Sequence, residues 1–309
     1  MWTDIAVNIS TVAVVIYLLL AVVEIGLDFK NKSGHYKLKD SLCSLTMGGF
    51  YISTKLLMKG TTFFIFFLAH EYALFDFGQS WWIFPLTFIV VDFSFYWLHR
   101  FIHEVRFAWA AHINHHSSKE FNLAGTAFRQ SFAEPVMEPF FYAPIVLLGF
   151  DPLMALAAIE LNLIYMYWLH TRKIGKLHRW FEYCFSTPSH HRVHHGSNLP
   201  YLDKNYGGTL ILFDRMFGTF AEEQEEVIFG VPDQLKTFNP IKATIHGWVE
   251  LGRDFIQTPG LLDKIKMLIM PPGWAPNGQG LTTRQKQQAY RNQQFAESNS
   301  MDSKAENET

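Results

Sequence analysis

One stretch of the chain joins an apolar segment to a pair of histidines: WWIFPLTFIVVDFSFYWLHRFIH, residues 81–103. Residues 81–98 are long and apolar enough to span a bilayer, and the tryptophan pair at their start is typical of a membrane–water interface. His99 and His103 follow at once and are four residues apart, so in a helix they share one face. The stretch therefore predicts a membrane helix that carries two imidazoles at its end.

The composition of the whole chain also indicates a membrane protein. Of its 309 residues, 49% are hydrophobic and 17% are charged, below the usual quarter for soluble domains. Phe occurs 29 times and Trp 9 times. The formal net charge of -2 argues against nucleic acid as a partner. The two cysteines, Cys43 and Cys184, exclude a disulfide framework and a cysteine-rich metal site.

Further apolar segments lie on both sides of this stretch. Residues 5–23 carry no charge and have the length of a span, and without a cleavage motif they predict a membrane anchor rather than a removed signal peptide. Apolar residues also dominate four other segments, of which the third is short for a full crossing: 41–58, 61–77, 135–148 and 152–169.

Basic residues predict which loops share a side of the membrane. The loop after the first span, residues 28–40, holds four lysines, and the polar segments 99–134 and 171–208 also carry Arg and Lys. Because such loops are retained in the cytoplasm, we expect all three on the cytoplasmic face. That arrangement requires residues 41–77 to cross the membrane only once.

The histidines are concentrated in the middle of the chain, with eleven of the 14 between residues 99 and 195. Besides the pair at 99 and 103, the segments HINHH (112–116) and HRVHH (191–195) share an H-x-x-H-H spacing that puts each set on one helical face. Neutral imidazole is the commonest metal ligand among side chains. Eight to ten imidazoles exceed the four ligands of one tetrahedral zinc, so the pattern predicts two metals.

The remaining histidines differ in their expected roles. His170 ends the segment 152–169 at the same presumed face and is expected to be a further ligand. The roles of His190 and His178 stay open, because His191 already supplies the spaced pattern and His178 has no patterned partner. Three histidines are expected to be ordinary packed or interfacial residues: His35, His70 and His246.

Two acidic residues are expected to act in the site. Asp92 lies inside an apolar span, where a charge is costly, on the same helical stripe as His99 and His103. It is expected to accept the outer ring N–H of a liganding histidine, the alternative being a polar partner on another helix. Glu104 is expected to act as a base or a metal carboxylate, the alternative being solvation at the interface.

The expected architecture is an all-α integral membrane protein, multi-pass, with a cytosolic-side helical cap that holds a histidine-rich di-metal site. We expect membrane helices in residues 1–80, the metal-binding core in 81–235 and a C-terminal cap segment in 236–278. Residues 279–309 are polar and are expected to be disordered.

Several motifs resemble the sterol desaturase and fatty acid hydroxylase superfamily over roughly 85–220: HRFIHE, HINHHSSKEFNL, WLHT and PSHHRVHHGSNLPYLDKNYGGTL. With LFDRMFGTF and the later PPGWAP, the last block is most similar to the alkylglycerol monooxygenase branch. The resemblance implies a non-haem di-iron centre that uses dioxygen and two electrons. Carried over position by position, the implied ligands are His99, His103, His112, His115, His116, His170, His191, His194 and His195. Met166 stands where some relatives have one more histidine.

These features predict a membrane-bound di-iron oxygenase that hydroxylates a lipid C–H bond, and the branch implies cleavage of an alkylglycerol ether. The electron donor stays open between tetrahydrobiopterin and a cytochrome b5 or ferredoxin-type carrier. The alternatives are a hydroxylase or desaturase of a sterol, carotenoid or fatty acyl lipid, and a zinc-dependent membrane hydrolase, since the sequence does not identify the metal. Three arginines are candidates to meet a lipid head group: Arg100, Arg129 and Arg192.

Overall fold

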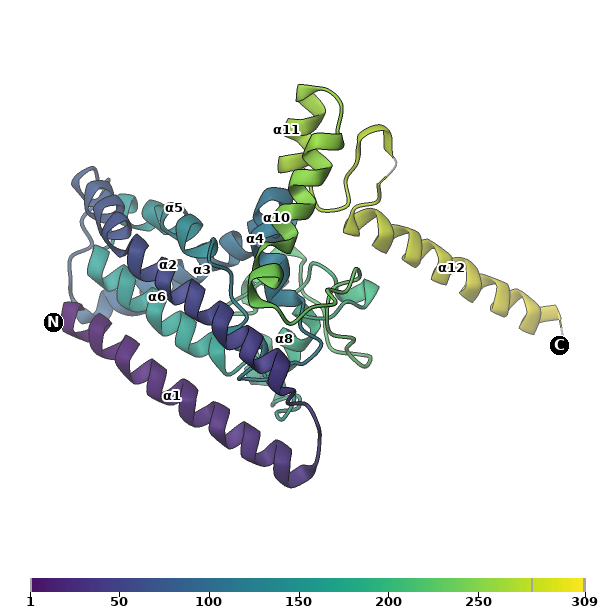
Figure 1. Cartoon of the computed structure of the whole chain (residues 1–309), viewed down its shortest axis with the longest axis horizontal. Helices are drawn as coiled ribbons and strands as arrows, with labels where there is room; N and C mark the ends of the chain where they lie inside the picture. The colour runs from purple at the N-terminus through teal and green to yellow at the C-terminus, as the bar shows by residue number, and fades with distance from the viewer. Residues whose placement is uncertain (1, 279, 308–309) are drawn as a thin grey trace.

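The computed structural model describes residues 2–278 and 280–307, with side chains for 12–297 apart from 277 and 279. Five helices pack side by side as a bundle (Figure 1). They are α1 (Trp2–Asn31), α2 (Leu38–Glu71), α3 (Phe84–Glu104), α5 (Glu134–Leu148) and α6 (Pro152–Tyr167). The described residues are predominantly helical, as expected.

Three segments are long and apolar enough to cross a membrane: Val12–Asn31, Leu38–Glu71 and Trp81–Glu104. The chain is therefore a membrane protein. The predicted apolar segments 41–58 and 61–77 are not two spans, because α2 runs unbroken from Leu38 to Glu71. Lys59 and Gly60, which separate the two segments, do not interrupt the helix. This single helix gives the one crossing that the arrangement of the loops requires.

Short elements follow the bundle at one of its ends. A single extended residue, Val105, separates α3 from α4 (Arg106–His116), so the two helices meet at a sharp corner. The chain then returns through α5 and α6 to a set of short helices, α7 (Arg179–Cys184), α8 (Pro188–His194) and α9 (Leu212–Phe217). Pro139 and Pro144 lie inside α5, which is 15 residues long and short for a full crossing, as expected.

The three basic loops meet at this same end. The Asn122 side chain donates a hydrogen bond to the His35 carbonyl at 2.7 Å, and Arg172 donates to the Lys119 carbonyl at 2.9 Å. Lys173 pairs with Asp28 at 3.1 Å. The shared end that the basic residues predicted is therefore present in the fold, while its cytoplasmic orientation remains a prediction.

Two further helices, α10 (Pro240–Gln257) and α11 (Leu261–Ile269), run across the direction of the bundle helices (Figure 1). The last helix, α12 (Thr283–Asn307), projects away from the rest (Figure 1). Within the segment 279–309, which was expected to be disordered, residues 283–307 are helical. The sequence of this helix is rich in Gln, Lys, Arg, Ala and Glu, which are good helix formers although they bury little. Gln287 anchors its start by donating to the carbonyls of Leu199 and Leu202.

Candidate metal centre

Four elements bring all nine predicted histidines together at the loop end of the bundle. α3 supplies His99 and His103, α4 supplies three, the chain just after α6 supplies His170, and α8 with the residue after it supplies three. All nine imidazoles are buried.

The nine histidines form two groups, within each of which the nitrogen atoms that face one another lie within 4.8 Å. The first group contains His99, His103, His112, His116 and His194, and the second contains His115, His170, His191 and His195. The rings of His116 and His195 stack across the boundary with centroids 4.3 Å apart. The two groups are therefore direct neighbours.

The outer ring nitrogens of several histidines are held by backbone carbonyls. The Nδ1 atoms of His99 and His194 lie 2.9 Å from the carbonyls of Tyr206 and Lys204. In the second group, the Nδ1 atom of His115 lies 3.1 Å from the Arg129 carbonyl. A carbonyl can only accept, so Nδ1 carries the proton and Nε2 keeps its lone pair.

The inner nitrogens have no satisfactory partners. The Nε2 atoms of four histidines in the first group are buried and have no hydrogen-bond partner among the described residues: His103, His112, His116 and His194. In the second group, Nε2 atoms face one another at 2.9 Å between His170 and His191. Unpaired buried nitrogens and opposed lone pairs both cost free energy, and a cation would remove both costs. The donor set therefore fits two metal ions.

Burial also keeps these imidazoles in the form that binds metal. It lowers the pKa of His112 to about 3 and that of His170 to about 4. Burial, reinforced by neighbouring imidazoles, holds the pKa values of His191 and His195 well below the ordinary value. Near neutral pH these side chains are therefore uncharged and keep a free lone pair.

A carboxylate that the sequence analysis missed supports the first group. His112 Nδ1 lies 2.7 Å from Glu134 Oε1, and both side chains are largely buried. A carboxylate in this position fixes the ring and makes the opposite nitrogen a stronger ligand. The signal in the sequence was a Glu in the first turn of an apolar helix, but its partner is 22 residues away and shares no periodicity with it.

Asp92 does not contact a histidine, which corrects the expected role. Its carboxylate accepts from the Asn162 side chain at 2.5 Å and from the backbone N–H groups of Thr209 and Leu210 at 2.8 Å each. The offset of seven residues from Asp92 to His99 puts the two about 10 Å apart along the helix, too far for contact. The alternative, a polar partner on another helix, is what the structure contains.

Glu104 also lies outside both groups. It pairs with Arg100 one turn earlier at 2.9 Å, and its side chain is 41% exposed. One residue after His103 the helix has turned by about 100°, which points Glu104 away from the metal-facing side. The surroundings of Glu104 therefore agree with the alternative expectation, that its side chain is solvated at the interface.

The other histidines lie apart from the two groups. His190 is buried, and its ring packs against that of Phe220 with centroids 5.5 Å apart. His178 precedes α7 and is exposed. Neither residue joins the nine, which resolves the placement that the sequence left open.

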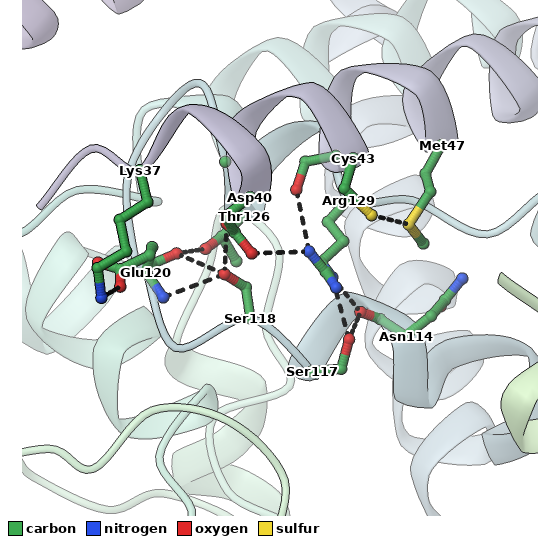
Figure 2. Close-up of polar contacts among 12 residues, drawn as sticks. Lys37, Asp40, Cys43, Met47, Asn114, Ser117, Ser118, Glu120, Thr126 and Arg129 are labelled. Atoms are coloured by element: carbon green, nitrogen blue, oxygen red, sulfur yellow. Dashed lines mark hydrogen bonds and ion pairs between the residues drawn. The ribbon is translucent and has the colours of Figure 1, made fainter. Parts of the chain in front are cut away.

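A buried ion pair links the second group to the membrane helices (Figure 2). Arg129 is 2% exposed, and its Nη1 atom donates to Asp40 in the first turn of α2 at 3.0 Å. Its Nε donates to the Asn114 carbonyl at 3.1 Å and to Ser117 at 3.0 Å, both at the end of α4. Since the carbonyl of Arg129 also accepts from His115, one residue connects α2, α4 and a histidine of the second group.

The head-group role considered for three arginines is not supported by their contacts. Arg129 is enclosed by the network just described. Arg100 pairs with Glu104, and Arg192 makes two bonds to Glu223 at 2.7 and 2.6 Å. All three guanidinium groups therefore already have carboxylate partners within the chain.

Comparison with known proteins shows which family and which enzymes the chain is similar to. Residues 84–219 match the family model described as fatty acid hydroxylase. The chain is similar to the alkylglycerol monooxygenases of Xenopus tropicalis (38% identical, covering 85% of this chain and 59% of that protein) and Homo sapiens (39%, covering 78% and 54%). The protein of the same name from Danio rerio is 37% identical, covering 83% and 58%. The chain thus spans a little over half the length of these relatives. No solved structure matches it at a comparable level of significance.

Proposed function

We propose, from the match of residues 84–219 to the fatty acid hydroxylase family model, that the chain is a membrane-bound monooxygenase that hydroxylates a lipid C–H bond. The observation that carries the proposal is the pair of adjoining groups of buried imidazoles, whose inner nitrogens lack other partners. Among the described residues, both groups consist of histidines alone, and imidazole ligands suit iron as well as zinc, copper and nickel.

We propose that each histidine group binds one iron ion. When bound, the two irons would supply the activation of dioxygen with two external electrons that attack on an unreactive C–H bond requires. The chain itself holds the ligands in place. Backbone carbonyls and Glu134 fix the ring tautomers, and burial keeps bulk water from the metal-facing nitrogens.

The names of the relatives, alkylglycerol monooxygenases, support an ether lipid as the substrate. We propose an alkylglycerol ether that enters from the bilayer. Insertion of one oxygen atom at the carbon next to the ether oxygen gives a hemiacetal, which collapses to an aldehyde and a free glycerol hydroxyl. The second oxygen atom leaves as water with two electrons and two protons. Tetrahydrobiopterin or a cytochrome b5 or ferredoxin-type carrier is the proposed electron source, acting from the cytoplasmic side.

Asp92 and Glu104 are proposed as positioning residues. Asp92 fixes the backbone at 209–210, three residues beyond Tyr206, whose carbonyl holds His99. Glu104 pairs with Arg100, which donates to the Tyr96 hydroxyl at 3.2 Å. Both therefore stabilise the end of α3, from which His99 and His103 project.

The test uses the full chain, purified in lipid nanodiscs. Metal analysis should give about two irons per chain, and an alkylglycerol should yield aldehyde only in the presence of oxygen and an electron donor. Turnover without oxygen, or a single zinc per chain, would contradict the proposal. Lipid extracts from cells with and without the gene identify the lipid class and separate alkylglycerols from sterols, carotenoids and fatty acyl lipids.

A further inference from the structure

Helix α10 presents a row of aliphatic side chains that no other part of the described chain covers. Ile241, Ile245, Val249 and Ile256 are between 40% and 79% exposed. Their spacing of four, four and seven residues puts them on one face of the helix. A surface helix of a soluble domain would carry polar residues there.

The opposite face of α10 packs against the protein and so keeps the aliphatic row pointing outward. Ala243, Gly247 and Leu251 are buried, and α10 packs against α4 and α2. A Cβ atom at Gly247 would lie only 2.6 Å from the Ala110 carbonyl, so the backbones of α10 and α4 are in close contact. The helix therefore cannot rotate to bury its aliphatic row without losing this packing.

Helix α11 repeats the pattern. Leu261, Leu262, Ile265 and Ile269 are between 45% and 72% exposed, whereas Met267 on the far side is buried against the rest of the protein. The two helices are joined by three residues, 258–260, and together form a hairpin with two exposed aliphatic rows. We call this the α10–α11 hairpin.

Cationic side chains flank both rows. On α10, Lys242 and Arg253 lie on one side of the row, about 55–75° around the helix from its centre, and on α11 Lys264 and Lys266 lie on either side of the row. Long basic side chains beside an aliphatic face are typical of helices that lie in a membrane interface, where the amines reach the lipid phosphates.

The orientation of the hairpin agrees with such a position. Its helices run across the direction of α1, α2 and α6 (Figure 1), and α2 is a membrane-spanning helix. Ala243 of α10 packs with Cys43 and Met47 near the start of α2, at the histidine end of the bundle. A helix that crosses the spans at that level lies along the plane of the membrane surface.

An apolar groove of about 340 Å³ opens beside the hairpin. It is lined by Trp248 of α10 together with Phe107, Phe132, Val136 and Met137. The same groove reaches Ala133, which precedes the Glu134 that contacts His112. Hydrocarbon at the hairpin would therefore be continuous with an apolar surface next to the first histidine group, which favours lipid over a protein partner.

We propose that the α10–α11 hairpin lies in the lipid interface of the bilayer, with its aliphatic rows among the upper acyl chains and its lysines and arginine at the head groups. This position does not depend on the reaction that the protein catalyses. It makes the hairpin a fourth contact with the membrane, in addition to the three spans.

The test compares two adjacent residues on different faces of α10. Cys184 is first replaced by Ser, and the other native cysteine, Cys43, is buried. In this background Ile256→Cys and Gln257→Cys are each labelled with a nitroxide. The full chain is placed in nanodiscs of phosphatidylcholine and phosphatidylglycerol. We expect the label at 256 to collide mainly with lipid-soluble oxygen, about 5–10 Å below the phosphates. The label at 257 should collide mainly with a water-soluble nickel chelate.

Two results would overturn the proposal. If both labels collide equally with the nickel chelate, the aliphatic row lies in water. If the label at 256 is shielded from both reagents and its spectrum is broadened by a second spin, another copy of the chain covers the row. Unchanged metal content in both labelled variants is the control for correct folding.

Discussion

The two histidine groups differ in how they are connected to the membrane. In the first group, His99 and His103 project directly from a spanning helix, and His112 is fixed by the carboxylate of Glu134. In the second group no histidine belongs to a span. His115 is linked to α2 through Arg129 and its ion pair with Asp40. Two ligands of the first group thus project from a spanning helix, whereas the ligands of the second group lie on α4, just after α6, and on or just after α8.

The largest effect is expected at the boundary between the groups. His194→Ala removes a ligand from the first group and leaves an unfilled space beside His195 of the second. Loss of residues that only support ligands typically costs 10–100-fold, so loss of this ligand should lower turnover by more than about 100-fold. Turnover and metal content of the purified variant are the measurements. The protein should stay in the membrane because its spans are unchanged, and near-normal turnover would remove His194 from the ligand set.

A change at Glu134 should affect the first group alone. Glu134→Gln weakens the support of His112 and should lower the metal affinity of that group by about 10–100-fold. The matched control is Glu138→Gln, one turn later on α5, because Glu138 contacts Tyr51 at 3.2 Å and no histidine. Titration with a chelator should release the metals in two steps in the Glu134 variant. One step, as in the control, would show that the two groups are not supported independently.

A change at Asp40 should affect the second group. Asp40→Asn leaves the buried guanidinium of Arg129 without a counter-charge, which costs about 3 kcal/mol in comparable pairs. Because Arg129 also holds His115, the second metal should be lost before the first during thermal unfolding. Ser44→Ala is the control, since Ser44 accepts a longer bond of 3.3 Å from the same Nη1 atom. Equal loss of both metals would contradict the distinction between the groups.

The smallest effect is expected at a histidine outside both groups. His178→Ala should change stability by less than about 0.5 kcal/mol, as for most substitutions that remove no buried contact. Metal content and turnover should match those of the unchanged protein. A loss of metal in this variant would show that His178 contributes to the metal centre.

The sequence predicted the parts of this molecule that depend on local periodicity. The span at 81–98 and the one-sided spacing of the histidines both follow from helix geometry, and the family resemblance based on those motifs is confirmed. The division into two groups was not predicted. His115 and His116 are adjacent in sequence but belong to different groups, and only the positions of α6 and α8 decide this.

Contacts between distant residues account for the rest of what was missed. Glu134 and Arg129 gain their importance from partners on other helices, and no spacing rule connects Arg129 with Asp40, 89 residues earlier. Asp92 was placed on the correct helical stripe, but the rise along the helix separates it from the histidines. Helical periodicity predicts the face of the helix on which a side chain lies. The packing of distant elements determines which residues that side chain contacts.

Neighbouring residues on two helices serve both groups: His115 with His116, and His194 with His195. The separation between the two metal positions is therefore built into the peptide geometry of α4 and of the end of α8. Exchanging side chains around the site can alter affinity but not this separation. Insertion of a single residue between His115 and His116 would turn one of them by about 100° and disable both positions together. Such an insertion would therefore act on the centre as a whole, unlike Glu134→Gln and Asp40→Asn, each of which acts on one group.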